Sequence, residues 1–298
     1  MAHDTAADLL TPIGIIGMGQ LGRSLARSLR EQGVNHVLVY DQSTDTAMAR
    51  AEAAGLRLLD GPQGLRAADI VFSAVNAAGA VAAARTCAPL LAEDAVYVDL
   101  NSMGSPEKRA VADVVTAAGR RFVDGAVLGA AADGIRMPII LSGPDAERVV
   151  SRLEPLGMNV RAVSAEVGHA ASIKIVRSVL AKGLEVLYVE ALLAARQLGV
   201  EDEVLKTFCD WLDARPAAAS ASILVTTHLL HAERRMHELD MSIDAVRQTG
   251  VDPVLTQAVR NRLATTAATG VAAQLKGVPP RSIEQALALL DAALRPRS

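Results

Sequence analysis

The stretch Ile13-Gly-Ile-Ile-Gly-Met-Gly-Gln-Leu-Gly22 decides the fold of this chain. An apolar run followed by G-x-G-x-x-G predicts a buried strand, a tight turn and a helix whose free N–H groups face the pyrophosphate of a dinucleotide. Gly17 allows the turn, Gly19 lets the backbone approach the phosphates, and Gly22 lets the helix pack closely on the sheet. Glycine-rich turns are common, so the prediction of a dinucleotide site also depends on the residues that follow this turn and its helix.

A second apolar segment, 36–40, ends in Asp41, close to where this fingerprint places an acidic residue. A carboxylate there binds the ribose hydroxyls of NAD and repels the 2′-phosphate of NADP. Gln42 and Ser43 follow instead of an arginine, so NAD is favoured, while Arg50 leaves NADP possible. The competing interpretation is a glycine turn followed by an unrelated acid.

Composition excludes several classes of protein. The 298 residues are 51% hydrophobic with a net charge of −3 and only 2% aromatic, which argues against nucleic-acid binding. Residues 1–11 lack the basic start and apolar stretch of a signal peptide, and no apolar run has the length of a membrane span. Cys87 and Cys209 lack metal-ligand spacing and are expected to be reduced. These features predict a cytoplasmic protein.

The first half alternates apolar segments with amphipathic ones, which predicts an α/β Rossmann-type domain over 1–164. From about residue 168 the pattern is helical, which predicts an all-α domain over 165–298 built on a long helix at 169–198. The expected strands are 13–16, 36–40, 69–75, 95–99, 121–124, 138–142 and 158–162. The expected helices are 20–32, 44–54, 77–91, 106–118, 145–155, 169–198, 202–213, 217–231, 232–249, 253–268 and 282–294.

Ligands of open α/β sheets bind at the carboxyl ends of the strands. Val75 and Asn76 end one expected strand, and Asn101 and Ser102 follow another. A loop serine that caps the next helix is the competing interpretation for Ser102. The predicted cofactor-binding residues are Gly17, Met18, Gly19, Gln20, Leu21, Gly22, Asp41, Val75, Asn76 and Ser102.

Four segments resemble the β-hydroxyacid dehydrogenases, which include 3-hydroxyisobutyrate, tartronate semialdehyde and 6-phosphogluconate dehydrogenases and the related imine reductases. The first is the fingerprint, and the second is Val98-Asp-Leu-Asn-Ser102 with Pro106 behind it. Asp124-Gly-Ala-Val-Leu-Gly129 is similar to the family's substrate-binding D-A-P-V-S-G. Gly168-His-Ala-Ala-Ser-Ile-Lys174 is similar to the G-x-G-x-x-x-K that supplies a catalytic lysine.

The departures from the family motifs fall where substrate is expected. Leu128 replaces the serine of the substrate loop, and Ser178 replaces an asparagine one turn beyond the lysine. His237 and Glu238 stand where the family has a further basic motif. The chain also resembles a branch with a C-terminal domain of the phosphogluconate dehydrogenase type, through Lys174-Ile-Val-Arg-Ser178 and His231-Ala-Glu-Arg-Arg235.

The resemblance implies that Lys174 lies near the nicotinamide and exchanges a proton with the substrate oxygen as hydride is transferred. Ser178 lies four residues on, on the same helical face, and either binds the substrate or bonds its own backbone. The stripe with Arg234 and Arg235 either clamps an anionic substrate group or is a solvated helix face. No metal site is expected. The predicted substrate-binding residues are Ser102, Asp124, Gly125, Leu128, Arg234, Arg235 and His237.

The sequence therefore predicts an NAD(P)-dependent oxidoreductase for a small, anionic hydroxy acid or its keto form, with Lys174 and Ser178 as catalytic residues. An imine reductase is the alternative enzyme, and a non-catalytic dinucleotide sensor or scaffold is the alternative of another class. The helix at 169–198 is apolar on more than one side, which predicts burial against a second subunit. The related enzymes also dimerise through their C-terminal domains, so a homodimer is expected.

Overall fold

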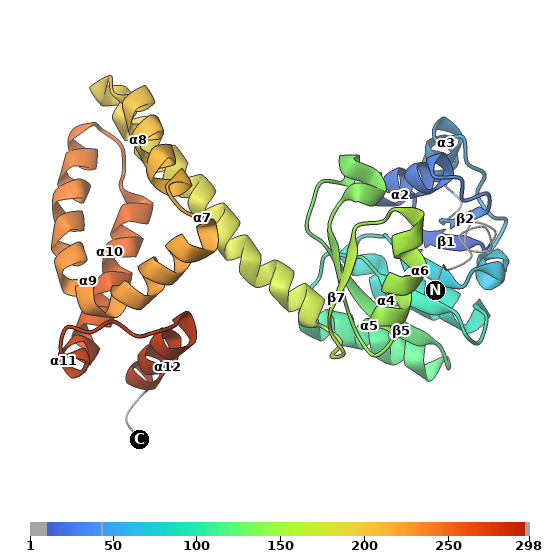
Figure 1. Ribbon diagram of the computed structural model, residues 1–298. Coiled ribbons are helices and arrows are strands. Elements are labelled where there is room, and N and C mark those ends of the chain that lie inside the picture. The colour runs from blue at the N-terminus through green and yellow to red at the C-terminus, as the bar shows by residue number, and fades with distance from the viewer. Residues whose placement is uncertain (1–10, 43, 296–298) are drawn as a thin grey trace. The chain divides into compact units, whose positions relative to one another are not determined.

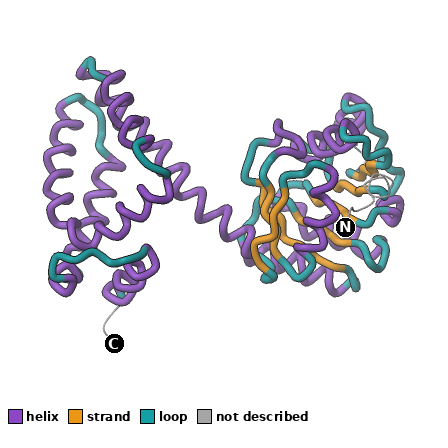
Figure 2. Tube along the Cα trace, viewed as in Figure 1, coloured by secondary structure: helices purple, strands orange, loops and turns teal. Residues whose placement is uncertain are grey.

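The computed structural model describes residues 11–42 and 44–295. The chain divides into two compact units, Met1–Val179 and Leu180–Ser298, and the boundary falls within one helix, α7 (His169–Leu198). All the strands of the described residues belong to the first unit, and the second unit is helical (Figure 2). The expected fold class is confirmed, whereas the domain boundary at 164/165 stays a prediction. No helix in the described ranges is long and apolar enough to cross a membrane.

The first unit is built on a seven-stranded sheet in the order β2-β1-β3-β4-β5-β6-β7. All neighbouring strands are parallel except β5 and β6. Because the strand order reverses on either side of β1, the crevice that binds ligands in such sheets opens where β1 and β3 end. The strands are β1 (Ile13–Ile16), β2 (Val37–Tyr40), β3 (Ile70–Ser73), β4 (Val96–Asp99), β5 (Arg121–Val127), β6 (Ile139–Ser142) and β7 (Val160–Ser164).

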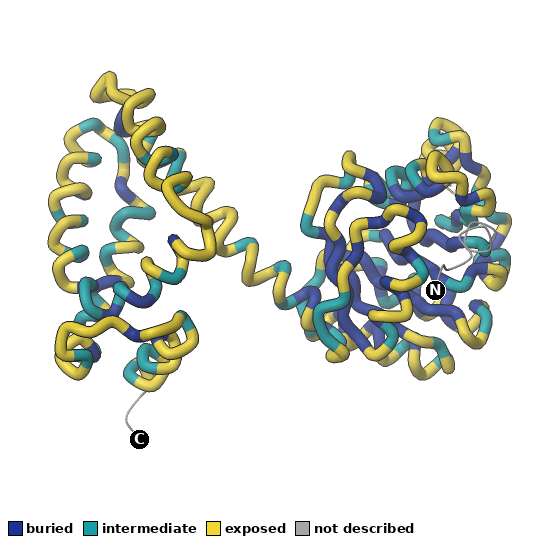
Figure 3. Tube along the Cα trace, in the orientation of Figure 1, coloured by how far each residue is buried: buried dark blue, intermediate teal, exposed yellow. Residues whose placement is uncertain are grey.

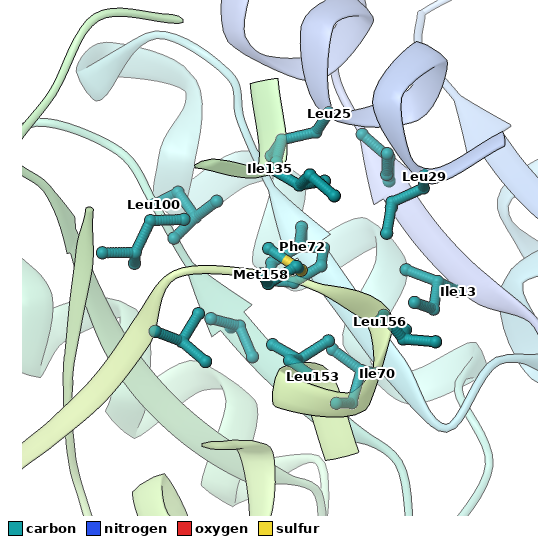
Figure 4. Close-up of a cluster of buried hydrophobic side chains, with 14 of the residues drawn as sticks. Ile13, Leu25, Leu29, Ile70, Phe72, Leu100, Ile135, Leu153, Leu156 and Met158 are labelled. Carbon is teal, nitrogen blue, oxygen red and sulfur yellow. The ribbon is translucent and has the colours of Figure 1, made fainter. Parts of the chain in front are cut away.

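Helices cover both faces of this sheet (Figure 1). On one face α2 and α6 pack on the strands through residues such as Leu25, Leu29 and Leu153, which meet Ile70 and Phe72 in one buried cluster (Figure 4). On the other face α4 and α5 pack on the alternate strand positions. The helices of this unit before α7 are α2 (Gln20–Glu31), α3 (Asp45–Ala53), α4 (Ala80–Cys87), α5 (Ser105–Ala117) and α6 (Ala146–Leu153).

Up to residue 295, the second unit contains the rest of α7 and five further helices. Helix α9 packs against α10, α11 and α12, with Leu229, Val271 and Ala286 at the centre of this contact. The helices that follow α7 are α8 (Glu201–Asp213), α9 (Ala217–Gln248), α10 (Val254–Ala268), α11 (Val271–Leu275) and α12 (Ile283–Leu294).

Three expectations about elements were wrong. The helices expected at 217–231 and 232–249 are one helix, α9, because no glycine or proline interrupts the sequence between them. The helix expected at 77–91 is α4 flanked by two 3₁₀ turns, with Gly79 and Pro89 at the transitions. Strand β5 continues to Val127 instead of ending at Asp124, because residues 124–127 pair antiparallel with β6.

Candidate active site

The fingerprint turn connects β1 to α2, and each glycine has a different environment. Gly17 has φ +100°, and an added Cβ would lie 2.6 Å from the carbonyl oxygen of Ala74. At Gly22 a Cβ would lie 1.9 Å from the carbonyl oxygen of Gly17. At Gly19 the nearest atom would be 3.9 Å away. The protein therefore leaves space in front of Gly19, at the N-terminus of α2, which is the space that a pyrophosphate requires.

Asp41 follows β2 and contacts this turn. Its Oδ2 accepts a hydrogen bond from Met18 N at 2.7 Å, and its Oδ1 accepts one from Gln42 N at 2.7 Å. Each oxygen keeps a further lone pair for a ribose hydroxyl. Ser43, which follows Gln42 in the segment that bears on cofactor choice, lies outside the described residues.

A hollow of about 230 Å³ lies beside Asp41, between the ends of β1, β2 and β3. Val75 and Asn76 line it together with Ile16 and Tyr40, and their contact with a cofactor stays a prediction. The Asn76 side chain also accepts a hydrogen bond from Gly79 N at 2.7 Å and so caps the turn that leads into α4. The structure therefore gives Asn76 a local role whether or not it contacts a cofactor.

Lys174 and Ser102 meet at a second hollow of about 360 Å³, which we call the Lys174 hollow. Lys174 Nζ donates a hydrogen bond to Ser102 Oγ at 2.8 Å. These two residues are 72 positions apart and come from α7 and from the end of β4. The hollow is lined by Leu21, Leu100, Ser102, Val127, Leu128, Gly129, Ala131, Lys174, Arg177 and Ser178.

The surroundings of Lys174 favour its neutral form. Burial, and to a lesser extent the positive charge of Lys108, lowers the pKa of the Lys174 amine below its ordinary range. A lysine with a lowered pKa gives up and takes back a proton more readily near neutral pH.

Ser178 lies one turn along α7 from Lys174 and lines the same hollow. Its hydroxyl donates to the carbonyl oxygen of Lys174 at 2.9 Å, so the backbone bond considered from the sequence is present. The oxygen of this hydroxyl can still accept a hydrogen bond from a ligand in the hollow.

Asp124 does not face the Lys174 hollow. Its side chain is fully buried, lies 3.2 Å from Lys108 Nζ and accepts a hydrogen bond from Ala171 N at 3.0 Å. The substrate contact predicted for this carboxylate is therefore not supported, because its oxygens face the interior. Gly125 is also buried, and a Cβ there would lie 2.5 Å from Leu100 Cδ2, so this glycine serves packing.

Sequence reasoning missed the partner of Asp124. Lys108 Nζ lies 2.6 Å from Asp99 Oδ1 and also donates to the carbonyl oxygens of Asp99 and Gly125. The sequence feature that indicates burial of Lys108 is its helical spacing from the apolar residues Val111 and Val115. This spacing places Lys108 on the buried face of α5.

The basic residues expected to bind substrate lie in the second unit, on α9. Arg234 pairs with Glu238, and Arg235 donates to Thr227 Oγ1 at 2.9 Å. His237 Nδ1 lies 3.7 Å from Asp240 Oδ2. Their role in substrate binding stays a prediction. Within residues 11–42 and 44–295 no group of three or more His, Cys, Asp or Glu side chains could hold a metal ion.

Residues 12–165, just over half of the chain, match the model of the NAD-binding domain of 6-phosphogluconate dehydrogenase. The chain belongs to the β-hydroxyacid dehydrogenase-like family. Membership in this family makes it a nicotinamide-dependent oxidoreductase, and the open space at Gly19 fits that cofactor. Residues 195–266 match a domain of unknown function.

Solved structures of similar proteins cover nearly the whole chain. A conserved hypothetical protein from Sinorhizobium meliloti is 29% identical with a TM-score of 0.60, over 96% of this chain and 97% of that one. A conserved protein described as similar to 3-hydroxyacid dehydrogenases is 27% identical with a TM-score of 0.58, over 88% and 98%. An imine reductase from Myxococcus stipitatus, solved with NAD+, is 17% identical with a TM-score of 0.75, over 96% and 99%. The last likeness concerns the fold alone.

Proposed function

We propose that this protein reduces a small keto acid or semialdehyde, or oxidises the corresponding hydroxy acid, with Lys174 as the proton donor or acceptor. The observation that supports this most is the 2.8 Å contact between Lys174 Nζ and Ser102 Oγ at the Lys174 hollow. The same hollow includes Leu21 of the fingerprint turn, so the amine and the predicted cofactor site belong to one region of the first unit.

The bound nicotinamide supplies or accepts the hydride. In the reducing direction the Lys174 ammonium gives a proton to the carbonyl oxygen, so the C=O bond becomes CH–OH. In the oxidising direction the neutral amine takes the hydroxyl proton. Ser102 orients the amine by accepting its hydrogen bond, and Leu100, Val127 and Leu128 limit the water beside it.

Replacing Lys174 tests this proposal. We expect Lys174→Ala to lower kcat by about 10² to 10⁴-fold while dinucleotide affinity stays within about twofold, because the pyrophosphate site lies at the fingerprint turn. The matched control is Lys182→Ala, which removes an exposed lysine of the same helix. Steady-state kinetics with a panel of hydroxy acids, aldehydes and imines, together with cofactor titration, measure both quantities. Turnover within a few-fold of normal in Lys174→Ala would exclude this lysine as proton carrier.

The lowered pKa of Lys174 sets the pH dependence. Reduction needs the protonated amine, so its rate falls as the pH rises through the pKa of Lys174. Oxidation needs the neutral amine, so its rate rises over the same interval. In the Lys174→Ala variant, the residual rates of reduction and of oxidation should no longer change with pH in this interval. Measuring both rates between pH 6 and 10 tests this.

An imine reductase is the second candidate function. It is favoured by the apolar lining of the Lys174 hollow, where Leu128 stands in place of a serine. An iminium substrate already carries its proton, so hydride transfer to it would survive in Lys174→Ala. Dinucleotide binding without turnover of any panel member would instead identify a sensor or scaffold.

We also propose that NAD is the preferred cofactor, because the Asp41 carboxylate lies at the fingerprint turn and Gln42 follows it without a cation. The double substitution Asp41→Ala with Gln42→Arg should shift preference toward NADP. Titration of the unmodified protein with both cofactors is the direct test. A tenfold tighter binding of NADP, about 1.4 kcal/mol, would contradict the role of Asp41.

We further propose that the protein is a homodimer that associates through α7. The second-unit part of α7 is mostly coloured as exposed (Figure 3). Its exposed large apolar residues are Leu180, Leu184, Val186, Leu187, Val189, Leu193 and Leu198. Exposed apolar residues in this number along one helix are typical of an interface between subunits.

A further inference from the structure

Lys108 is a buried charged residue of the first unit. It belongs to α5, only 1% of its side chain is exposed, and it is paired with two buried carboxylates, Asp99 and Asp124. Burying an ammonium and two carboxylates costs several kcal/mol per ion, which the pairing offsets only when the geometry is good. Apolar residues of similar size are often as stable in such places. We therefore expect a role beyond packing for the cluster of Lys108, Asp99 and Asp124.

On one side the cluster holds the start of α7. Asp124 Oδ2 accepts a hydrogen bond from Ala171 N at 3.0 Å. Ser142 Oγ accepts one from Ala170 N at 2.9 Å and donates to Asp124 at 3.2 Å. Lys174 is on the same helix, three residues after Ala171. The first turn of the helix that carries Lys174 is thus fixed by an aspartate that Lys108 neutralises.

On the other side the cluster holds the segment that carries Ser102. Asp99 Oδ1 accepts a hydrogen bond from Asn101 N at 2.9 Å, and Asp99 Oδ2 accepts one from Asn101 Nδ2 at 3.0 Å. Asn101 precedes Ser102, which accepts the hydrogen bond from Lys174 Nζ. The segments that carry Lys174 and Ser102 are therefore both linked to the ammonium of Lys108, the first through Asp124 and the second through Asp99.

The charged residues of the cluster and of the Lys174 hollow come from several elements. They are Lys108 on α5, Asp99 on β4, Asp124 on β5 and Arg177 on α7 itself, which lines the same hollow. The charge of Lys108 is the second cause, after burial, of the lowered pKa of Lys174. Lys108 thus acts on Lys174 through its positive charge as well as through the hydrogen bonds of the cluster.

We propose that Lys108 is a positioning residue for the reaction at Lys174, because it holds α7 and the Ser102 segment together and sets the charge beneath the reacting amine. This proposal rests on the proposed role of Lys174. Lys108 itself is not one of the residues that line the Lys174 hollow.

The decisive measurement is the titration of Lys174 itself, which does not require turnover. The full chain is labelled with trace acetic anhydride at a series of pH values, and the extent of acetylation of each lysine is read by peptide mass spectrometry. The exposed Lys182 is the internal reference. Lys108→Met and Asp124→Asn are compared with the unmodified protein, and Lys206→Met, at an exposed lysine of the second unit, is the matched charge-loss control.

The two substitutions should shift the titration in opposite directions. Losing the positive charge in Lys108→Met should raise the labelling midpoint of Lys174 by roughly half a unit or more, whereas losing a negative charge in Asp124→Asn should lower it. A loss of structure alone would move both variants toward the value of a solvated lysine. We also expect kcat to fall about tenfold in Lys108→Met while the dinucleotide dissociation constant is unchanged.

The proposal is overturned if folded Lys108→Met keeps the midpoint of Lys174 and kcat within twofold of the unmodified protein. If Lys108→Met does not fold, Lys108→Gln takes its place, and an unchanged midpoint of Lys174 with an unchanged kcat in that variant overturns the proposal. Failure of the proposed function has a different signature, since Lys174→Ala would then retain turnover while the labelling shifts persist.

Discussion

At the residue scale, the three glycines of the fingerprint differ in what an added methyl group would meet. At Gly22 the methyl would collide with the backbone carbonyl of Gly17, whereas at Gly19 it would enter open space. We therefore expect Gly22→Ala to destabilise the first unit by more than about 2 kcal/mol, since backbone cannot easily move aside. Gly19→Ala should leave stability within about 0.5 kcal/mol and weaken dinucleotide binding at least tenfold. Thermal unfolding and cofactor titration measure the two effects separately.

Gly119→Ala is a useful comparison, because its φ of +71° strains an alanine while the space around it is open. It should cost stability through the backbone without affecting cofactor binding. Normal dinucleotide affinity in Gly19→Ala would contradict the assignment of the open space to a pyrophosphate.

At the element scale, one side chain of α7 holds the start of α10 within the second unit. The carboxylate of Glu190 accepts hydrogen bonds from Leu255 N at 2.7 Å, from Thr256 N at 2.9 Å and from Thr256 Oγ1 at 2.5 Å. Burial by itself raises the pKa of Glu190, but these hydrogen bonds outweigh it and lower the pKa below its ordinary value. The position at a helix N-terminus also favours the negative charge.

Because the folded-state pKa of Glu190 is lowered, its stabilising contribution is present above the unfolded-state pKa of about 4.3. That contribution is lost as the pH falls through the folded-state value. Glu190→Gln should lower the free energy of unfolding by about 1–3 kcal/mol at pH 7 and by less at acidic pH. Denaturant unfolding at pH 7 and at about pH 3, clearly below the unfolded-state pKa, tests this, with the exposed Glu185→Gln as control. An equal loss at both pH values would show that the charge is not what stabilises this contact.

At the scale of the whole molecule, the exposed apolar residues of α7 lead to a prediction about assembly. Light scattering should find a homodimer at micromolar concentration, with an interface of more than roughly 2,000 Å² as in permanent complexes. Leu184→Glu combined with Leu187→Glu should produce monomers, because each places a charge in an apolar contact. Met48→Glu, at an exposed apolar residue of α3 in the first unit, is the control and should remain dimeric. A stable, active monomer of the unmodified protein would rule the proposal out.

Local sequence was enough to predict the α/β unit. Strand β1, the fingerprint turn and α2 lie within 20 residues, and their glycine spacing and apolar periodicity are properties of neighbouring residues. The same holds for the long helix α7 and for the position of Lys174 near its start. The expected division of α9 into two helices is wrong because no glycine or proline interrupts the helix there.

The sequence by itself thus determined the dinucleotide fold, the family and the lysine that the family motif carries. Only the tertiary structure decided what Asp124 does, since its partners Lys108 and Ala171 lie 16 residues before it and 47 residues after it. Whether a carboxylate at the end of a strand faces ligand or interior depends on which side chains the sheet brings beneath it. A buried ion pair requires both partners to leave water together, and that pairing is a property of the packed fold rather than of either local segment.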